Sequence, residues 1–203
     1  MKRTVSMLAA FFLLVPLVVD AQVEKGNWFL NGASNLAVNA GKWNYKVDGD
    51  KQEGYKMMSF NFRPYIGYAV IDRLPVGIFL EGEISSYKYP DDDKETFTIV
   101  AIGPFVRYYF GDLNNFMPFA EGSVGFGTYR FKDFDGDVSK EGYFAYRLGA
   151  GFSYFFNQYV GLDLFLGYGH QVYTDKDTGE GGDFKSIYGY FDASLGIVIS
   201  LGR

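Results

Sequence analysis

Apolar and polar residues alternate along eight successive segments of this chain. In residues 76–84, Ile78 and Leu80 fall on one side of the alternation, whereas Glu81 and Glu83 fall on the other. A period of two residues is typical of β-strands, because successive side chains point to opposite faces of a sheet. The pattern predicts eight strands, at residues 27–39, 56–70, 76–88, 96–110, 118–130, 142–156, 159–173 and 185–201.

The two faces of these predicted strands differ in chemistry. One face is apolar and carries no Asp or Glu, and its only Lys or Arg residues stand at the ends of spans (Lys56, Lys88, Arg130 and Lys185), whereas the other carries glycines, serines and charges. A soluble lipocalin-like barrel is the main alternative, but it would face water with its charges and line its cavity with apolar residues. The pattern therefore favours an all-β fold, an eight-stranded antiparallel up-and-down transmembrane β-barrel, with its apolar face toward lipid. An even number of strands also allows the sheet to close, so that no backbone edge is left in hydrocarbon.

Eight charged residues fall on the predicted inner face and are the candidate functional residues of the lumen. They are Arg63, Glu81, Glu83, Arg107, Glu121, Arg147, Asp163 and Asp192. Arg107 and Glu121 fall at similar heights on neighbouring strands, and we expect each arginine to have a carboxylate partner, because an unpaired charge is costly inside a protein. The network is open to two interpretations, a gated ion path or an interior plug. An eight-stranded barrel is only wide enough to be filled by its side chains, which favours the plug, although the interior glycines leave room for water-filled pockets.

The connections between the predicted strands alternate in length. Short connections fall at residues 71–75, 111–117 and 157–158, and longer, charged connections at 40–55, 89–95, 131–141 and 174–184. Outer-membrane barrels have short periplasmic turns and longer external loops. We therefore expect both termini to lie in the periplasm, and the four longer loops to be available to an extracellular partner.

The N-terminus has the features of a secretory signal peptide. Lys2 and Arg3 precede an apolar run of about fifteen residues, short for a transmembrane helix, and Val19-Asp20-Ala21 resembles a cleavage site. We expect residues 1–21 to be the signal peptide and 22–203 the barrel domain, with an uncleaved anchor as the alternative. The chain contains no cysteine, which excludes a lipoprotein, a disulfide and a thiolate metal site.

The charge balance and the aromatic content narrow the class of partner. The sequence has 19 basic and 24 acidic residues, which argues against nucleic acid as a partner. It also has 17 tyrosines and 21 phenylalanines, an excess that fits the aromatic girdles of a membrane barrel.

A histidine and a group of aspartates are further candidates for chemical sites. His170, the only histidine, is predicted to point outward, and Val172 stands where some lipid-modifying barrels have a serine. Asp133, Asp135 and Asp137 alternate as in a calcium loop and are weak candidates for a metal site, but Gly136 is misplaced for an EF-hand and position twelve is Phe144. We therefore expect no catalytic residues, no enzymatic activity and no cofactor.

Three segments carry a resemblance to a known group of proteins. They are Phe62-Arg63-Pro64-Tyr65-Ile66-Gly67-Tyr68, Ile102-Gly103-Pro104-Phe105-Val106-Arg107-Tyr108-Tyr109-Phe110 and Tyr146-Arg147-Leu148-Gly149-Ala150-Gly151-Phe152. The chain from residue 22 onward resembles the small eight-stranded outer-membrane barrels, which include the OmpA membrane domain, OmpX-like proteins and the outer membrane protein beta-barrel domain common in Bacteroidetes. The resemblance implies a place in the outer membrane of a Gram-negative bacterium, contact with outer-membrane lipid and lipopolysaccharide, and insertion by the barrel-assembly machinery.

The sequence thus leads to an expected function and two alternatives. The leading expectation is an integral outer-membrane barrel with a structural or surface-interaction role and a polar lumen filled by side chains. A narrow channel or small-ligand conduit is the first alternative, because the lumen is rich in glycine. A lipid-modifying outer-membrane enzyme that uses His170 is the second.

Overall fold

The computed structural model is an antiparallel β-structure, described here for residues 23–32, 37–47, 50–90, 93–111, 115–175 and 184–202. The predicted signal peptide lies outside these residues. The strands of the described part are β1 (Trp28–Asn31), β2 (Ala37–Val47), β3 (Asp50–Phe62), β4 (Tyr65–Ile71), β5 (Leu74–Lys88), β6 (Lys94–Tyr109), β7 (Phe116–Lys132), β8 (Val138–Phe155), β9 (Val160–Asp175) and β10 (Phe184–Leu201). None of the described residues forms a helix that is long and apolar enough to cross a membrane.

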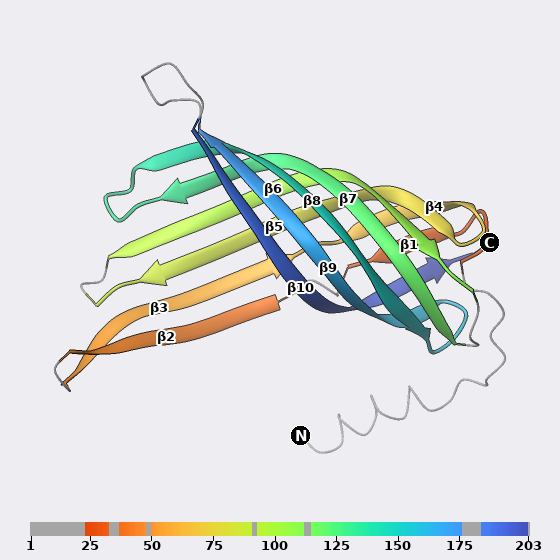
Figure 1. Ribbon diagram of the computed structural model, residues 1–203, viewed down its shortest axis with the longest axis horizontal. Coiled ribbons are helices and arrows are strands. Elements are labelled where there is room, and N and C mark those ends of the chain that lie inside the picture. The colour runs from red at the N-terminus through yellow and green to blue at the C-terminus, as the bar shows by residue number, and fades with distance from the viewer. Residues whose placement is uncertain are drawn as a thin grey trace.

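Eight of these strands close into the ring of the predicted barrel where β1 lies between β10 and β4, whereas among the described residues the rest of β10, from Phe184 to Ile197, pairs only with β9 and β2 pairs only with β3. β1 pairs with β10 on one side and with β4 on the other, and each remaining neighbour from β4 to β10 is paired antiparallel. β2 and β3 form a hairpin that adds to the edge of β5 beyond β4. We call the end of the barrel that holds Trp28 and Leu201 the terminal end, and the end that holds the 89–93 and 133–137 connections the loop end (Figure 1).

The first two predicted strands are interrupted in the structure. The prediction of one strand at 56–70 is wrong at Arg63 and Pro64, which separate β3 from β4. Proline lacks the backbone N–H that a strand donates to its neighbour, which explains the break. The predicted strand at 27–39 is likewise divided between β1 and β2.

The strands also extend further toward the loop end than the sequence pattern predicts. The predicted loop at 40–55 is wrong, because β2 and β3 pair through most of it, from Ala37↔Asn61 to Val47↔Asp50. The predicted loop at 131–141 shortens to residues 133–137, and β6 begins at Lys94, within the predicted loop at 89–95. At the predicted loop at 174–184, β9 extends to Asp175 and β10 begins at Phe184, and the residues between them lie outside the described part of the chain. Once strands leave the lipid they need no apolar face, so alternation fades although backbone pairing continues.

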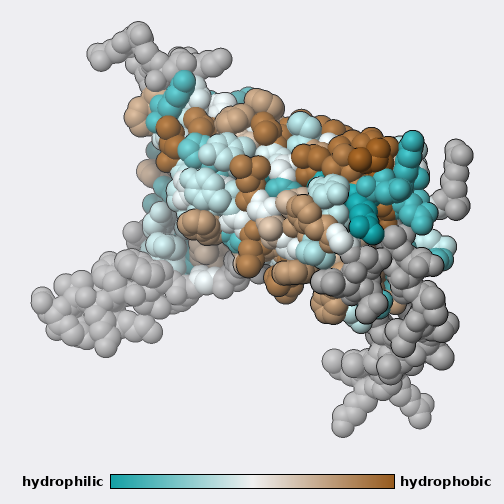
Figure 2. All heavy atoms as spheres, turned by 45° about the vertical axis from the view of Figure 1, so that its right-hand side comes forward, coloured by the Kyte–Doolittle hydropathy of each residue, from teal (hydrophilic) through white to brown (hydrophobic). Residues whose placement is uncertain are grey.

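The outer wall of the barrel is apolar. On β6 and at Phe110 directly after it, the outward positions from Val100 onward alternate with buried residues, and this run of 11 residues carries no outward charge. At about 3.4 Å per residue and a tilt of about 40°, such a run spans about 26 Å, close to the apolar band of outer-membrane barrels. Figure 2 shows hydrophobic side chains spread over the visible wall. The predicted assignment of the outward face is confirmed by the exposure of these side chains.

Candidate functional site in the barrel lumen

Aromatic side chains fill the terminal half of the lumen. Phe29, Tyr109, Phe119 and Phe155 are each no more than 1% exposed and belong to one continuous cluster. These residues share the inward face with the charges, as a period of two requires. The cluster leaves a polar layer of arginines and carboxylates directly on top of it, toward the middle of the barrel.

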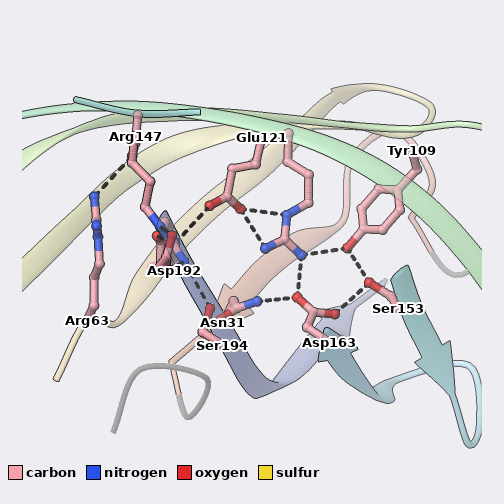
Figure 3. A network of polar contacts seen from close by, with 12 residues as sticks. Asn31, Arg63, Tyr109, Glu121, Arg147, Ser153, Asp163, Asp192 and Ser194 are labelled. Carbon is pink, nitrogen blue, oxygen red and sulfur yellow. Dashed lines mark hydrogen bonds and ion pairs between the residues drawn. The ribbon is translucent and has the colours of Figure 1, made fainter. Parts of the chain in front are cut away.

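Arg107 on β6 is the centre of this polar layer. Its Nε donates to Glu121 Oε2 at 2.8 Å, and its Nη1 lies 2.5 Å from Asp163 Oδ2 and donates to Tyr109 Oη at 3.1 Å (Figure 3). Arg107 is 3% exposed and Asp163 is 1% exposed. Because the guanidinium pairs with carboxylates on both β7 and β9, it joins strands that are not neighbours.

Asp163 collects hydrogen bonds from three strands besides its own. Asn31 Nδ2 on β1 donates to Asp163 Oδ2 at 2.5 Å, and Ser153 Oγ on β8 donates to Asp163 Oδ1 at 2.5 Å. With the contact from Arg107, both carboxylate oxygens are satisfied. A buried carboxylate is tolerated when its lone pairs are occupied in this way.

A second arginine extends the layer toward β10. Arg147 on β8 forms an ion pair with Asp192 and donates to Ser194 Oγ at 2.9 Å, and its Nη1 lies 3.8 Å from Glu121 Oε1. Glu121 therefore lies between Arg107 and Arg147 and links the two halves of the network. Asp192 is the more accessible partner, with 23% of its side chain exposed.

Arg63 is the exception to the expected pairing. It lies opposite Glu81 in the continuation of the β3–β5 register, but none of the ion pairs between described residues includes it. Its Nη2 donates to Ser123 Oγ at 3.0 Å, and its Nε has no hydrogen-bond partner. The structure thus brings together Arg107, Glu121, Arg147, Asp163 and Asp192, and leaves Arg63, Glu81 and Glu83 outside these ion pairs.

Each of the three lumen arginines lies over a phenylalanine. The guanidinium carbon of Arg63 is 4.2 Å from the ring centroid of Phe79, that of Arg107 is 3.9 Å from Phe119, and that of Arg147 is 3.8 Å from Phe165. Such stacking is attractive, particularly where water is excluded. The sequence did not predict these phenylalanines as partners, although they share the parity of the charges, and that parity was the signal for them.

The loop half of the lumen is hollow. A cavity of about 1030 Å³ lies there, with Arg63, Arg147 and Asp192 among its lining residues. Its other lining residues include Asn61, Glu81, Glu83, Tyr87, Phe97, Tyr129, Tyr173 and Tyr190. The prediction of a lumen filled by side chains is therefore wrong for this half, and the cavity ends at the arginine layer.

The remaining sequence candidates lie away from the lumen network. His170 packs against Tyr146 with ring centroids 4.9 Å apart. Asp133 and Asp137 belong to a turn in which Asp133 Oδ1 accepts the backbone N–H of Asp137 at 2.9 Å, and Gly136 has a positive φ of 90°. Among the described residues, no group of three or more His, Cys, Asp or Glu side chains is placed to hold a metal ion.

Comparison with known proteins supports the fold. No protein-family model matches the chain, and no curated protein matches it. Among solved structures, Neisserial surface protein A matches with a TM-score of 0.50 and 18% identity, over 86% of this chain and 97% of that one. Outer membrane protein OprG from Pseudomonas aeruginosa matches with a TM-score of 0.46 and 18% identity, over 91% and 100% of the two chains. Outer membrane protein W of E. coli matches with a TM-score of 0.44 and 14% identity, over 87% and 97%. The similarity to Neisserial surface protein A shows that the chain has the fold of a small outer-membrane β-barrel.

Proposed function

We propose that this protein is an integral outer-membrane barrel of a Gram-negative bacterium that does not conduct ions and acts through its loop end. In this proposal, residues 1–21 are a signal peptide, the terminal end faces the periplasm, and the loop end faces the outside. The role is structural or one of surface interaction, without enzymatic activity or a cofactor. Lipopolysaccharide and other outer-membrane lipid contact the apolar wall, and the barrel-assembly machinery inserts the chain.

The ion-pair layer built on Arg107 is the observation that supports a closed lumen. It connects β6, β7, β8, β9 and β1 through side chains that are at most 5% exposed. The aromatic cluster with Phe29, Tyr109, Phe119 and Phe155 lies beneath it. Moving an ion through this layer would require separating buried ion pairs, which is costly in a low-dielectric interior.

A narrow channel is the second candidate, and the cavity of about 1030 Å³ in the loop half is the observation that favours it. That cavity covers only part of the path across the membrane. A conducting pathway would need a second opening through the Arg107 layer and the aromatic cluster. The cavity is better explained as a pocket that ends at the arginine layer.

Planar-bilayer recording of the refolded wild-type protein tests the proposal. We expect no conductance steps above background, because the arginine layer and the aromatic cluster close the lumen. The double variant Arg107→Ala, Asp163→Ala removes both members of a central pair and should produce small conductance steps. Lys140→Ala, which changes an exposed charge at the loop end, is the matched control and should remain silent.

The recording on the wild-type protein decides the question by itself. Reproducible steps from correctly folded wild-type barrels would overturn the closed-lumen proposal in favour of the channel. A silent wild type supports the closed barrel whether or not the double variant folds.

A further inference from the structure

The cavity in the loop half presents oxygen acceptors that have no donor. Asn61 Oδ1 and Glu81 Oε2 are buried and have no hydrogen-bond partner. Asn61 pairs in register with Glu83, which follows Glu81 on the same face of β5, so the three side chains share one patch of the wall. Leaving such buried atoms unsatisfied is destabilising, and more so for a charged group. The patch is therefore suited to a ligand that donates several hydrogen bonds.

Carboxylates dominate the charge of this patch. Glu81 Oε1 accepts only a long hydrogen bond of 3.4 Å from Tyr143 Oη, and Glu83 Oε1 accepts one of 3.1 Å from Ser85 Oγ. Arg63 is the nearby cation, and 92% of it is buried, but its hydrogen bond goes to Ser123. Arg63 is thus the nearby cation for both Glu81 and Glu83, but neither carboxylate forms an ion pair with it.

The charges on β5 to β10 are sorted by face in the loop half. The cations there point outward and are exposed: Lys88, Lys94, Arg130, Lys132, Lys140 and Lys185. Glu95, Glu141 and Asp175 have the inward parity and are partly buried. Glu95 is paired in register with Tyr87, and Glu141 with Tyr129, and both tyrosines line the cavity. Carboxylates gathered at a rim concentrate ions of the opposite sign, so this entrance favours cations although Arg63 and Arg147 line the cavity further in.

Aromatic rings line the cavity beside the carboxylates. Tyr87, Phe97, Tyr129 and Tyr173 form a continuous arc, with ring centroids 5.4, 6.1 and 5.1 Å apart in that order. Aromatic faces attract cations and also cover apolar carbon. A ligand that suits this arc carries both a positive charge and a hydrocarbon portion.

From these contacts we propose that the cavity binds a primary organic ammonium ion. Its N–H groups donate to Glu81 Oε2 and Asn61 Oδ1, and its hydrocarbon portion lies against the arc of Tyr87, Phe97, Tyr129 and Tyr173. A primary ammonium has three donors, whereas a quaternary ammonium has none and would leave the two oxygens unsatisfied. The volume of about 1030 Å³ is sufficient for a small organic molecule together with water.

Isothermal titration calorimetry on the refolded protein in detergent at pH 7 tests this site with three probes. They are 2-phenylethylammonium, its uncharged analogue 2-phenylethanol, and its trimethylated quaternary analogue. We expect 2-phenylethylammonium to bind saturably, at least about tenfold more tightly than the alcohol, because a hydrogen bond to a charged group is worth that much. The quaternary ion should bind with an affinity between those of the other two probes, since it retains only its attraction to the aromatic rings and to the carboxylates.

Two variants locate the site. Glu81→Gln keeps the shape of the side chain and removes its charge, and it should weaken binding of 2-phenylethylammonium about tenfold. Glu24→Gln makes the same change on an exposed side chain at the terminal end and should leave binding unchanged. Equal binding of the amine and the alcohol, or no binding of the amine to the wild type, would overturn the proposal and leave the cavity occupied by water only. Binding that Glu81→Gln does not alter would place the amine elsewhere and overturn this site.

The site rests on the proposed function only in that the arginine layer closes the inner end of the cavity. Failure of the amine site and failure of the closed lumen can be distinguished, because calorimetry measures binding and bilayer recording measures conductance. A wild-type barrel that conducts and also binds the amine overturns the closure alone. A silent barrel that does not bind the amine overturns the site alone.

Discussion

At the scale of single residues, Arg107 is the side chain on which the polar layer depends. It compensates Glu121 and Asp163 at once, and both carboxylates are buried with it. Removing one partner of a buried ion pair leaves an uncompensated charge, which is more destabilising than replacing the whole pair. Because Arg107 lies between two carboxylates, replacing Arg107 alone should cause a measurable loss of stability.

We expect Arg107→Ala to lower the free energy of unfolding by about 3–5 kcal/mol, because Glu121 and Asp163 would remain buried without their cation. Arg107→Lys should lie between this variant and the wild type, since lysine restores the charge but not the forked geometry of the guanidinium. Urea-induced unfolding in lipid vesicles, followed by tryptophan fluorescence, measures the difference. Arg130→Ala, at an exposed position, should change stability by less than about 0.5 kcal/mol. An Arg107→Ala barrel as stable as Arg130→Ala would show that the network contributes little.

At the scale of the elements, one arrangement recurs in three strand pairs. Arg63, Arg107 and Arg147 each lie over a phenylalanine on a neighbouring strand, reached through a short connection at the terminal end. The phenylalanine rings in turn cover inward glycines, because a Cβ at Gly125 would lie 2.9 Å from Phe79 and one at Gly151 would lie 2.7 Å from Phe119. The interior glycines therefore accommodate rings instead of leaving water-filled space at these positions.

Strand coiling adds a second requirement for glycine at Gly103 on β6. A Cβ there would collide with the carbonyl oxygen of Val124 and lie 2.7 Å from the Cα of Gly125, so a backbone would have to move. We expect Gly103→Ala to destabilise the barrel by about 1–3 kcal/mol, the usual cost of overpacking. Gly142→Ala is the control, because its nearest neighbour would be 3.7 Å away. The same unfolding assay compares the two variants, and equal stabilities would contradict the close approach of β6 and β7.

The sequence predicted the strands well where lipid imposes alternation. The strands β5 to β10 overlap the predicted ranges, because an outward charge within the apolar band would cost about 2–4 kcal/mol at its centre. The part of the β2–β3 hairpin within residues 40–55 was predicted as a loop because its sequence, which includes Lys42, Asn44 and Lys46, does not alternate between apolar and polar residues. The pairing of Arg107 with Glu121 followed from register, whereas the contact of Arg107 with Asp163 crosses the lumen and depends on barrel curvature, which no single strand encodes.

At the scale of the whole molecule, the lumen is divided into a closed half and an open half. The terminal half is packed with aromatic rings below the arginine layer, and the loop half holds the cavity that Glu81 and Glu83 line. In this arrangement the packed terminal half stabilises the barrel, and the loop half holds the proposed binding site. Substitutions at Glu81 can change what the cavity binds while the ion pairs of Arg107 remain intact.

Closure of this ring depends on the short contact between β1 and β10. Val198 on β10 is fully buried and pairs with Asn31 on β1 and with Gly161 on β9. Closed barrels have no free edge, so we expect the wild type to resist SDS at room temperature and to run as a compact band until it is boiled. Val198→Pro removes a backbone donor and a buried side chain at this contact, so this variant should lose the compact band. Phe184→Pro, at the exposed start of β10, is the control and should retain it. A Val198→Pro barrel that still shifts only on boiling would mean that other strand pairs keep the ring closed without β1.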